Sequence, residues 1–97
     1  MFQIKWTKKA LHEQAEILTY WIARNKSNTF SKKILLELKD KELLLKQNPL
    51  IGKATDFEQV RVVIILKNFS LFYRVKPGIV EILSFWDNRR DPENIEI

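Results

Sequence analysis

Three runs rich in β-branched and aromatic residues fill the second half of the chain, at positions 60–66, 69–76 and 79–86. Two-residue gaps, Lys67-Asn68 and Pro77-Gly78, separate them. Gaps this short leave room only for tight hairpin turns, so consecutive runs have to pair antiparallel. The sequence therefore predicts a three-stranded antiparallel meander, and this limits the folds that the rest of the chain can complete.

The first half of the chain predicts one short strand and two helices. Positions 2–6 alternate apolar and polar residues, as a strand does, and Thr7 is a plausible helix cap. Apolar residues then recur at helical spacing over positions 8–24 (Leu11, Ala15, Leu18, Ile22, with Ala10, Ile17 and Trp21 alongside). They recur again over positions 30–47 (Phe30, Ile34, Leu38, Leu45, with Leu35 beside them). Asn48-Pro49 ends the second helix, and positions 50–58 are expected to be irregular.

These elements predict an α+β fold in the order β-α-α-β-β-β. The helical hairpin is expected to pack on one face of a small, mostly antiparallel sheet. The chain has no internal repeat and no Pro/Gly/Ser-rich linker. We therefore expect a single domain over residues 1–97.

Composition excludes several kinds of chemistry. The chain has no Cys and one His, His12, which excludes disulfides, thiol catalysis and a His-based metal site. It has no Gly-rich phosphate loop, and we expect neither a metal nor a small-molecule cofactor. No run reaches the roughly 18 apolar residues of a membrane helix, and no secretory signal is visible, so we expect a cytoplasmic protein without a membrane partner. The net charge of +5 favours nucleic acid or acidic partners, although many small proteins carry surplus lysines.

The expected strand register places two arginines side by side. If both gaps are two-residue turns, Val60, Val62, Ile64 and Leu66 face the helices, and Arg61 lies opposite Arg74 on the outer face. Like charges in this position destabilise a sheet by up to about 1 kcal/mol. Either the pair grips a phosphate or carboxylate, or Glu81 and solvent neutralise it.

The same register predicts an apolar cluster on the outer face that no helix can cover. Its members are Val63, Ile65, Phe72, Leu83 and Phe85. Either a partner docks there or the C-terminal residues fold back over it. Lys53, Arg89 and Arg90 are expected to complete a basic rim, unless the last two are a solvated pair beside Asp87 and Asp91.

A plain nucleic-acid binder is another interpretation, with Phe72 and Phe85 as stacking platforms. The chain lacks the glycine-rich aromatic motifs of an RRM, the GXXG loop of a KH domain and a convincing helix-turn-helix.

Several segments, taken in order, resemble the RelE/ParE superfamily of bacterial toxins. They include Tyr20-Trp21-Ile22-Ala23, Asn48-Pro49-Leu50-Ile51-Gly52-Lys53, Phe72-Tyr73-Arg74-Val75 and Ile82-Leu83-Ser84-Phe85-Trp86 running into Arg89-Arg90-Asp91-Pro92. The resemblance implies the same β-α-α-β-β-β fold. It also implies that the chain is the growth-inhibiting toxin of a type II toxin–antitoxin pair. A cognate antitoxin would then lay an extended or helical segment over it.

The resemblance leaves the target open. RelE-like members cleave messenger RNA on the ribosome, whereas ParE-like members poison DNA gyrase. Lys53, Arg61 and Arg74 match basic positions of the nucleases, but Trp86 and Asp87 stand where many nucleases have His or Tyr. The absence of a clear acid–base pair slightly favours gyrase; a messenger endoribonuclease and an inert binding module remain alternatives. Candidate catalytic residues are Lys53, Arg61, Arg74, Asp87 and Arg89; candidate antitoxin- or target-binding residues are Val63, Ile65, Phe72, Leu83, Phe85 and Arg90.

Overall fold

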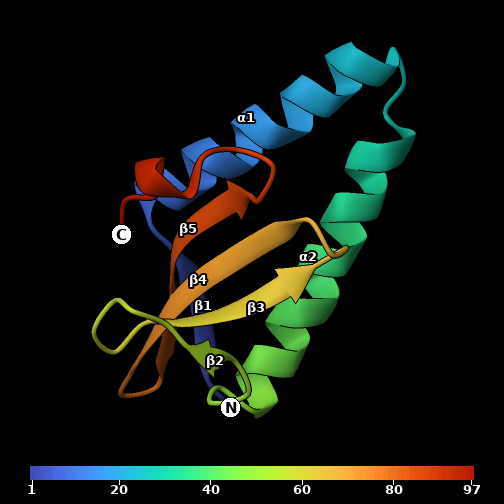
Figure 1. Ribbon diagram of the computed structural model, residues 1–97. Coiled ribbons are helices and arrows are strands. Elements are labelled where there is room, and N and C mark those ends of the chain that lie inside the picture. The colour runs from blue at the N-terminus through green and yellow to red at the C-terminus, as the bar shows by residue number, and fades with distance from the viewer.

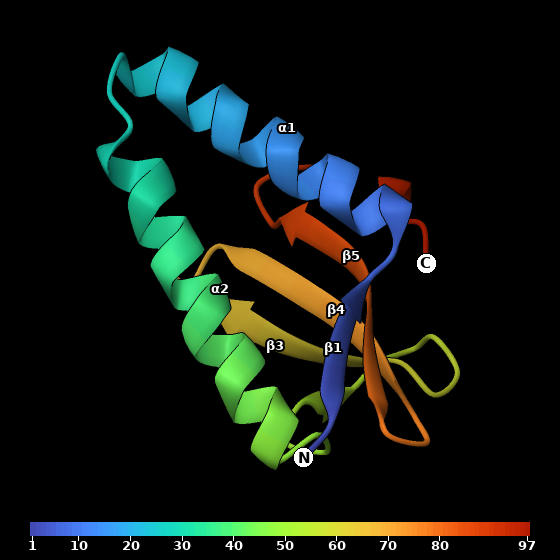
Figure 2. The same cartoon turned by 180° about the vertical axis from the view of Figure 1, so that it is seen from behind.

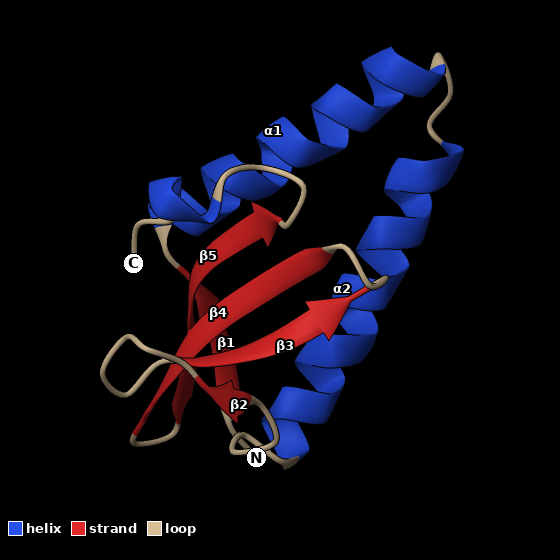
Figure 3. Cartoon of the chain, in the orientation of Figure 1, coloured by secondary structure: helices blue, strands red, loops and turns tan.

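A computed structural model describes all 97 residues as two helices and a five-stranded sheet (Figure 1, Figure 3). The sheet has the order β1-β5-β4-β3-β2, in which β1 and β5 are parallel and the other pairs antiparallel. This confirms the predicted α+β fold, with β2 as an addition in the segment expected to be irregular. The elements are β1 (Gln3–Trp6), α1 (Lys8–Asn25), α2 (Thr29–Gln47), β2 (Lys53–Ala54), β3 (Arg61–Ile65), β4 (Phe69–Lys76), β5 (Ile79–Asp87) and a short 3-10 helix, η1 (Pro92–Asn94).

Both helices cover the same face of the sheet, as predicted (Figure 2). Helix α1 packs along β5, and α2 packs against β3 and β1. The two helices splay from the turn that joins them, so their far ends reach different parts of the sheet (Figure 2). The main core between helices and sheet comprises Ala10, Ile17, Ile34, Leu38, Leu45, Ile65, Phe69, Leu71, Tyr73, Val80, Ile82 and Phe85.

Helix α1 starts as expected but buries a different face. The Thr7 Oγ1 atom accepts a hydrogen bond from the Ala10 amide at 3.1 Å, which is an N-cap. Ala10 and Ile17 are buried, whereas Leu11 and Ile22 are 50% and 43% exposed. The buried side of α1 is therefore centred on Ala10 and Ile17, which were expected beside the main apolar row, and not on Leu11 and Ile22. In α2 the prediction is confirmed, because Ile34, Leu38 and Leu45 are all buried.

The turn between β3 and β4 has three residues, not the predicted two. Leu66 and Lys67 have φ of +49° and +68°, and β3 pairs with β4 from Ile65 opposite Phe69. Each β3 residue is therefore shifted by one against β4 relative to the prediction. Because side chains alternate between faces, this shift turns the whole strand over.

A second irregularity lies between β4 and β5. The predicted Pro77-Gly78 turn is confirmed, since Lys76 pairs with Ile79 and Gly78 has a φ of +72°. Farther along, Tyr73 pairs with Ile82 but Phe72 pairs with Ser84. Leu83 is thus an extra residue, a β-bulge, and after it Phe85 lies on the helix-facing side of the sheet instead of the expected outer side.

Neither α1 nor α2 combines the length and the apolar character that crossing a membrane requires.

Candidate functional site

Tyr73 and Arg61 together hold the loop that precedes β2. The Tyr73 hydroxyl donates to the Pro49 carbonyl at 2.7 Å and accepts from the Gly52 amide at 2.8 Å. The Arg61 Nη1 group donates to the carbonyls of Gly52 at 2.8 Å and Leu50 at 3.3 Å. These contacts give side-chain partners to the carbonyls of Pro49, Leu50 and Gly52 and to the Gly52 amide. Tyr73, Arg61 and Gly52 are called the loop clamp below.

The loop clamp also alters the chemistry of Tyr73. Burial raises the pKa of its hydroxyl above the ordinary value of 10.0, against the lowering effects of the Gly52 hydrogen bond and the Arg61 charge. Tyr73 is fully buried in the main core. It is therefore a neutral structural donor at physiological pH.

The predicted pair of Arg61 and Arg74 does not form. Arg61 lies opposite Tyr73 and shares its helix-facing side, whereas Arg74, the next residue along β4, projects to the outer face. The cause is the three-residue turn after Ile65, which turned β3 over. Arg74 is half-buried opposite Glu81, and Glu81 forms its ion pair with Lys76 at 3.2 Å. A joint grip of these two arginines on one phosphate is excluded by this geometry.

The predicted outer apolar cluster is also corrected. Val63, Ile65 and Phe85 pack in the main core on the helix side, because of the turn before Phe69 and the bulge at Leu83. Phe72 and Leu83 do lie in a separate outer cluster, but they are only 7% and 8% exposed. The chain's own residues supply the cover, as the alternative of a folded-back tail anticipated. The outer cluster consists of Val60, Phe72, Leu83 and Trp86, with Val62 and Ile95 packed against it.

Basic side chains surround this outer cluster. Lys53 pairs across the strands with Val62, which packs on the cluster, and so points to the same face. The Arg90 guanidinium lies 4.6 Å from the centre of the Trp86 ring. With Arg74, these residues form a basic rim, called the outer cations below. The predicted rim thus exists in part, without Arg61 and without Arg89, which stacks over Trp21 of α1.

Arg89 and Asp87 form a closed pair at the end of β5. The Arg89 side chain donates through Nε to Asp87 Oδ1 at 2.9 Å and through Nη2 to Oδ2 at 3.0 Å, and its amide reaches Oδ1 at 3.0 Å. Its guanidinium also stacks over Trp21, 4.4 Å from the ring centre. Both carboxylate oxygens of Asp87 are therefore occupied, and the charge of Arg89 is largely neutralised.

A hollow of about 660 Å³ lies between α1 and the segment that leaves β5. Three sequence-predicted residues, Asp87, Arg89 and Arg90, come together in its wall, and α1 contributes Trp21 and Arg24. Arg24 and Arg90 are exposed there and make no ion pair within the chain. The hollow offers cations to a ligand, whereas its acidic groups already have partners within the chain.

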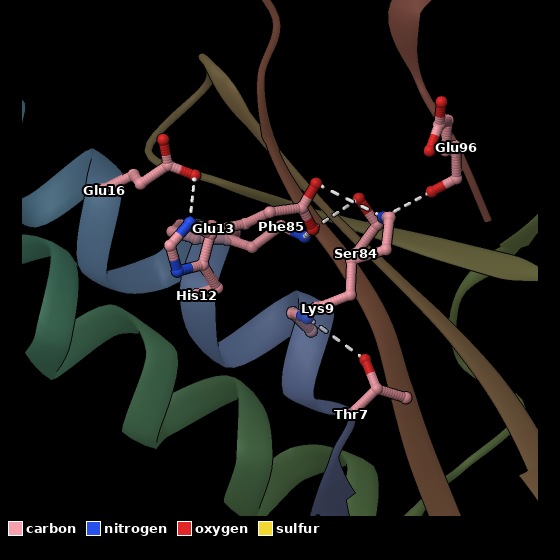
Figure 4. A network of polar contacts seen from close by, with 9 residues as sticks. Thr7, Lys9, His12, Glu13, Glu16, Ser84, Phe85 and Glu96 are labelled. Atoms are coloured by element: carbon pink, nitrogen blue, oxygen red, sulfur yellow. Dashed lines mark hydrogen bonds and ion pairs between the residues drawn. The ribbon is translucent and has the colours of Figure 1, made fainter.

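Glu13 is a residue whose role the sequence analysis missed. Its Oε1 atom accepts from the Ser84 hydroxyl at 3.0 Å and the Phe85 amide at 3.1 Å, and its Oε2 atom pairs with Lys9 at 3.3 Å. Figure 4 shows this carboxylate reaching from α1 to β5, next to the exposed pair of His12 and Glu16. Glu13 is three residues after Ala10 and four before Ile17, and this helical spacing predicts that it lies on the buried side of α1.

These contacts engage the candidate acids and bases of the site. Asp87 is bound by Arg89, Glu13 is bound by backbone and hydroxyl donors, and Tyr73 is locked in the loop clamp. His12 stands on the exposed side of α1, paired with Glu16 at 3.2 Å. General acid–base catalysis needs two such groups within reach of one substrate atom.

Comparison with known proteins identifies the family. The profile of ParE toxins of type II toxin–antitoxin systems (parDE) matches residues 4–92, and the chain belongs to this family. The fold is similar to a chromosomal ParDE system from P. aeruginosa, with a TM-score of 0.76 at 23% identity over 90% of this chain and 96% of that one. It is also similar to the isolated E. coli RelE toxin, with a TM-score of 0.64 at 17% identity over 96% and 90% of the two chains. YafQ from E. coli has a TM-score of 0.58 at 10% identity over 92% of this chain and 96% of its own.

At these identities the solved structures show a common fold alone. A comparison with curated protein sequences finds no match. The chain is therefore placed by its family profile, as a ParE-like toxin of a toxin–antitoxin system whose partner is an antitoxin.

Proposed function

We propose that this toxin inhibits growth by binding DNA gyrase, not by cleaving messenger RNA, and that its antitoxin prevents this. ParE-like toxins poison gyrase, and the chain belongs to the ParE family. A gyrase poison needs a binding surface and no ribonuclease site. The proposed action is therefore stoichiometric binding.

The observation that carries this proposal is the closed pair of Asp87 and Arg89. Asp87 was the only candidate base near the end of the last strand, and Arg89 occupies both of its carboxylate oxygens. Arg61, the cation expected to assist a transferring phosphate, donates to the loop carbonyls of Leu50 and Gly52. Ribonuclease chemistry would require both groups to break these bonds first.

The outer cations are the proposed contacts to the target. Lys53 and Arg90 are exposed, Arg74 is half-buried, and none has an acidic partner within 4.0 Å. Cations without partners keep their charge available for an acidic protein surface or for DNA held by gyrase. Aromatic residues lie beside them, since Phe57 contacts Phe72 edge-on with ring centres 6.4 Å apart. We expect Phe57, which is 39% exposed, to join this contact.

The test is expression of the toxin alone in bacteria. We expect growth arrest with double-strand breaks in the chromosome, lost supercoiling and intact messenger RNA. The variant Lys53→Glu/Arg74→Glu should restore growth at an unchanged protein level. Lys67→Glu, which changes charge by the same amount per site in the exposed β3–β4 turn, should remain toxic.

The remaining outcomes each decide against the proposal. Cleaved messenger RNA with normal supercoiling would favour the ribonuclease alternative. Unimpaired growth with soluble, folded toxin present would favour an inert binding module. Equal toxicity of Lys53→Glu/Arg74→Glu and wild type would show that the outer cations do not contact the target.

A further inference from the structure

Helix α2 carries two exposed leucines on the side that faces away from the sheet. Leu36 and Leu43 are 64% and 58% exposed, whereas Ile34, Leu38 and Leu45 of the same helix are buried. Seven residues are nearly two helical turns, so the two leucines lie one above the other. Figures 1 and 2 show no other segment of the chain over this side of α2.

The residues around these leucines are mostly positive. Positions three and four residues away are their neighbours on a helix surface. No side chain among them takes part in an ion pair within 4.0 Å. These neighbours are Lys32, Lys33, Lys39 and Lys46, with Asp40 as the one acid and Gln47 as the one neutral residue. Leu36, Leu43 and the four lysines are called the α2 stripe below.

We propose that the α2 stripe is the docking site for an acidic amphipathic helix of the antitoxin. The inference deepens the proposed function and rests on it for the identity of the partner. Leucines seven residues apart match the spacing of a helix packed lengthwise on α2. Four lysines against one aspartate select a partner helix with Glu or Asp beside its apolar side chains.

The same charges exclude a symmetric pairing of two copies of this chain. Two α2 stripes placed face to face would bring eight lysines together around four leucines, and like charges across an interface repel. The α2 stripe is also separate from the outer cations. It belongs to a helix that covers the other face of the sheet (Figure 2). If the antitoxin docks here, a different segment of the antitoxin has to cover the outer cations.

The test uses purified full-length toxin and a labelled synthetic helix as the probe. The probe is about three heptads long, with leucines at seven-residue spacing and glutamates beside them. Fluorescence anisotropy should show saturable binding that weakens as salt is raised. We expect Leu36→Ser/Leu43→Ser to weaken the affinity at least about tenfold, and a probe with lysine in place of glutamate to bind at least about tenfold more weakly.

Matched variants control this experiment. Leu11→Ser removes a leucine that is 50% exposed on α1, and it should leave the affinity unchanged. If circular dichroism shows that the double serine variant is unfolded, Leu36→Ala/Leu43→Ala tests the same surface with a residue that favours helix. Lys39→Glu should weaken probe binding, whereas Lys67→Glu should not.

Several results would overturn the inference. These are absent probe binding by the wild type, equal loss in Leu11→Ser, and sedimentation showing a dimer that the leucine variants abolish. Binding to vesicles containing phosphatidylglycerol without binding to the probe would point to a membrane instead. Gyrase is not used in these measurements. A toxin that binds the probe but does not inhibit gyrase would therefore contradict the proposed function and leave this inference standing.

Discussion

Gly52 and Tyr73 approach so closely that no side chain fits between them. The Gly52 amide donates to the Tyr73 hydroxyl at 2.8 Å. A Cβ atom on Gly52 would lie 2.5 Å from that hydroxyl oxygen and 2.9 Å from the carbonyl oxygen of Val62. Absence of a side chain at position 52 is therefore what lets the loop between α2 and β2 rest on the sheet.

Gly52→Ala should lower the free energy of unfolding by about 1–3 kcal/mol, because buried groups must shift to admit the methyl group. The penalty should shrink in a Tyr73→Phe background, where the hydroxyl is absent. Chemical denaturation of the four chains of this double-mutant cycle measures the coupling. Gly78→Ala is the control: no atom lies within 4 Å of its Cβ position, so its left-handed backbone strain should not couple to Tyr73. Additive Gly52 and Tyr73 effects would contradict the loop clamp.

The stability of the chain should depend on Tyr73 at alkaline pH. Burial raises the pKa of Tyr73, so the folded chain keeps the phenolic proton at a pH where the unfolded chain has lost it. The stabilisation is complete below pH of about 10 and is lost as pH rises through the folded-state pKa. The difference in free energy of unfolding between wild type and Tyr73→Phe should therefore fall above pH of about 10. A difference that stays constant or grows there would oppose this pKa shift.

Arg61 and Arg74 should behave differently when removed. Arg61→Ala loses two hydrogen bonds to loop carbonyls and should lower the free energy of unfolding by about 1–3 kcal/mol. Arg74→Ala removes a cation without an ion pair and should change it by less than about 0.5 kcal/mol. Thermal or denaturant unfolding of both variants measures this. Equal stability of the two variants would mean that Arg61 does not secure the loop.

We expect the hydrogen bonds of Glu13 to stabilise the packing of α1 on β5. Glu13→Ala leaves the Ser84 hydroxyl and the Phe85 amide without their acceptor and should cost about 1–3 kcal/mol of unfolding free energy. Glu16→Ala, which breaks only an exposed pair with His12, should cost less than about 0.5 kcal/mol. Hydrogen exchange at the Phe85 amide gives a second readout, and we expect it to accelerate in Glu13→Ala. Unchanged exchange would contradict the contact.

Most of the fold could be predicted from the sequence, because hydrophobic period and turn residues act locally. The β4 bounds and the Pro77-Gly78 turn were predicted correctly. The β3–β4 turn was not, since Leu66 and Lys67 adopt left-handed conformations that nothing in their identity favours. An error of one residue in the predicted length of this turn reverses which face each β3 side chain occupies.

The candidate site was less predictable, because it depends on that register and on contacts distant in sequence. Arg61 was expected outside and lies inside, and the bulge at Leu83 moved Phe85 into the core. Neither the bulge nor the bond from Glu13 to Ser84, 71 positions away, leaves a local pattern. Arg74 was placed on the outer face correctly because its face is set within β4, whereas the face of Lys53 follows from its pairing with Val62 of β3.

The most direct measurement of the central claim is a supercoiling assay with purified gyrase, relaxed plasmid and purified toxin. We expect inhibition that rises with toxin concentration, accumulation of linear plasmid after protease treatment, and weaker inhibition by Lys53→Glu/Arg74→Glu than by Lys67→Glu. In parallel, ribosomes translating a defined messenger should leave it intact. Normal supercoiling at saturating toxin, together with messenger cleavage on the ribosome, would contradict the proposed function.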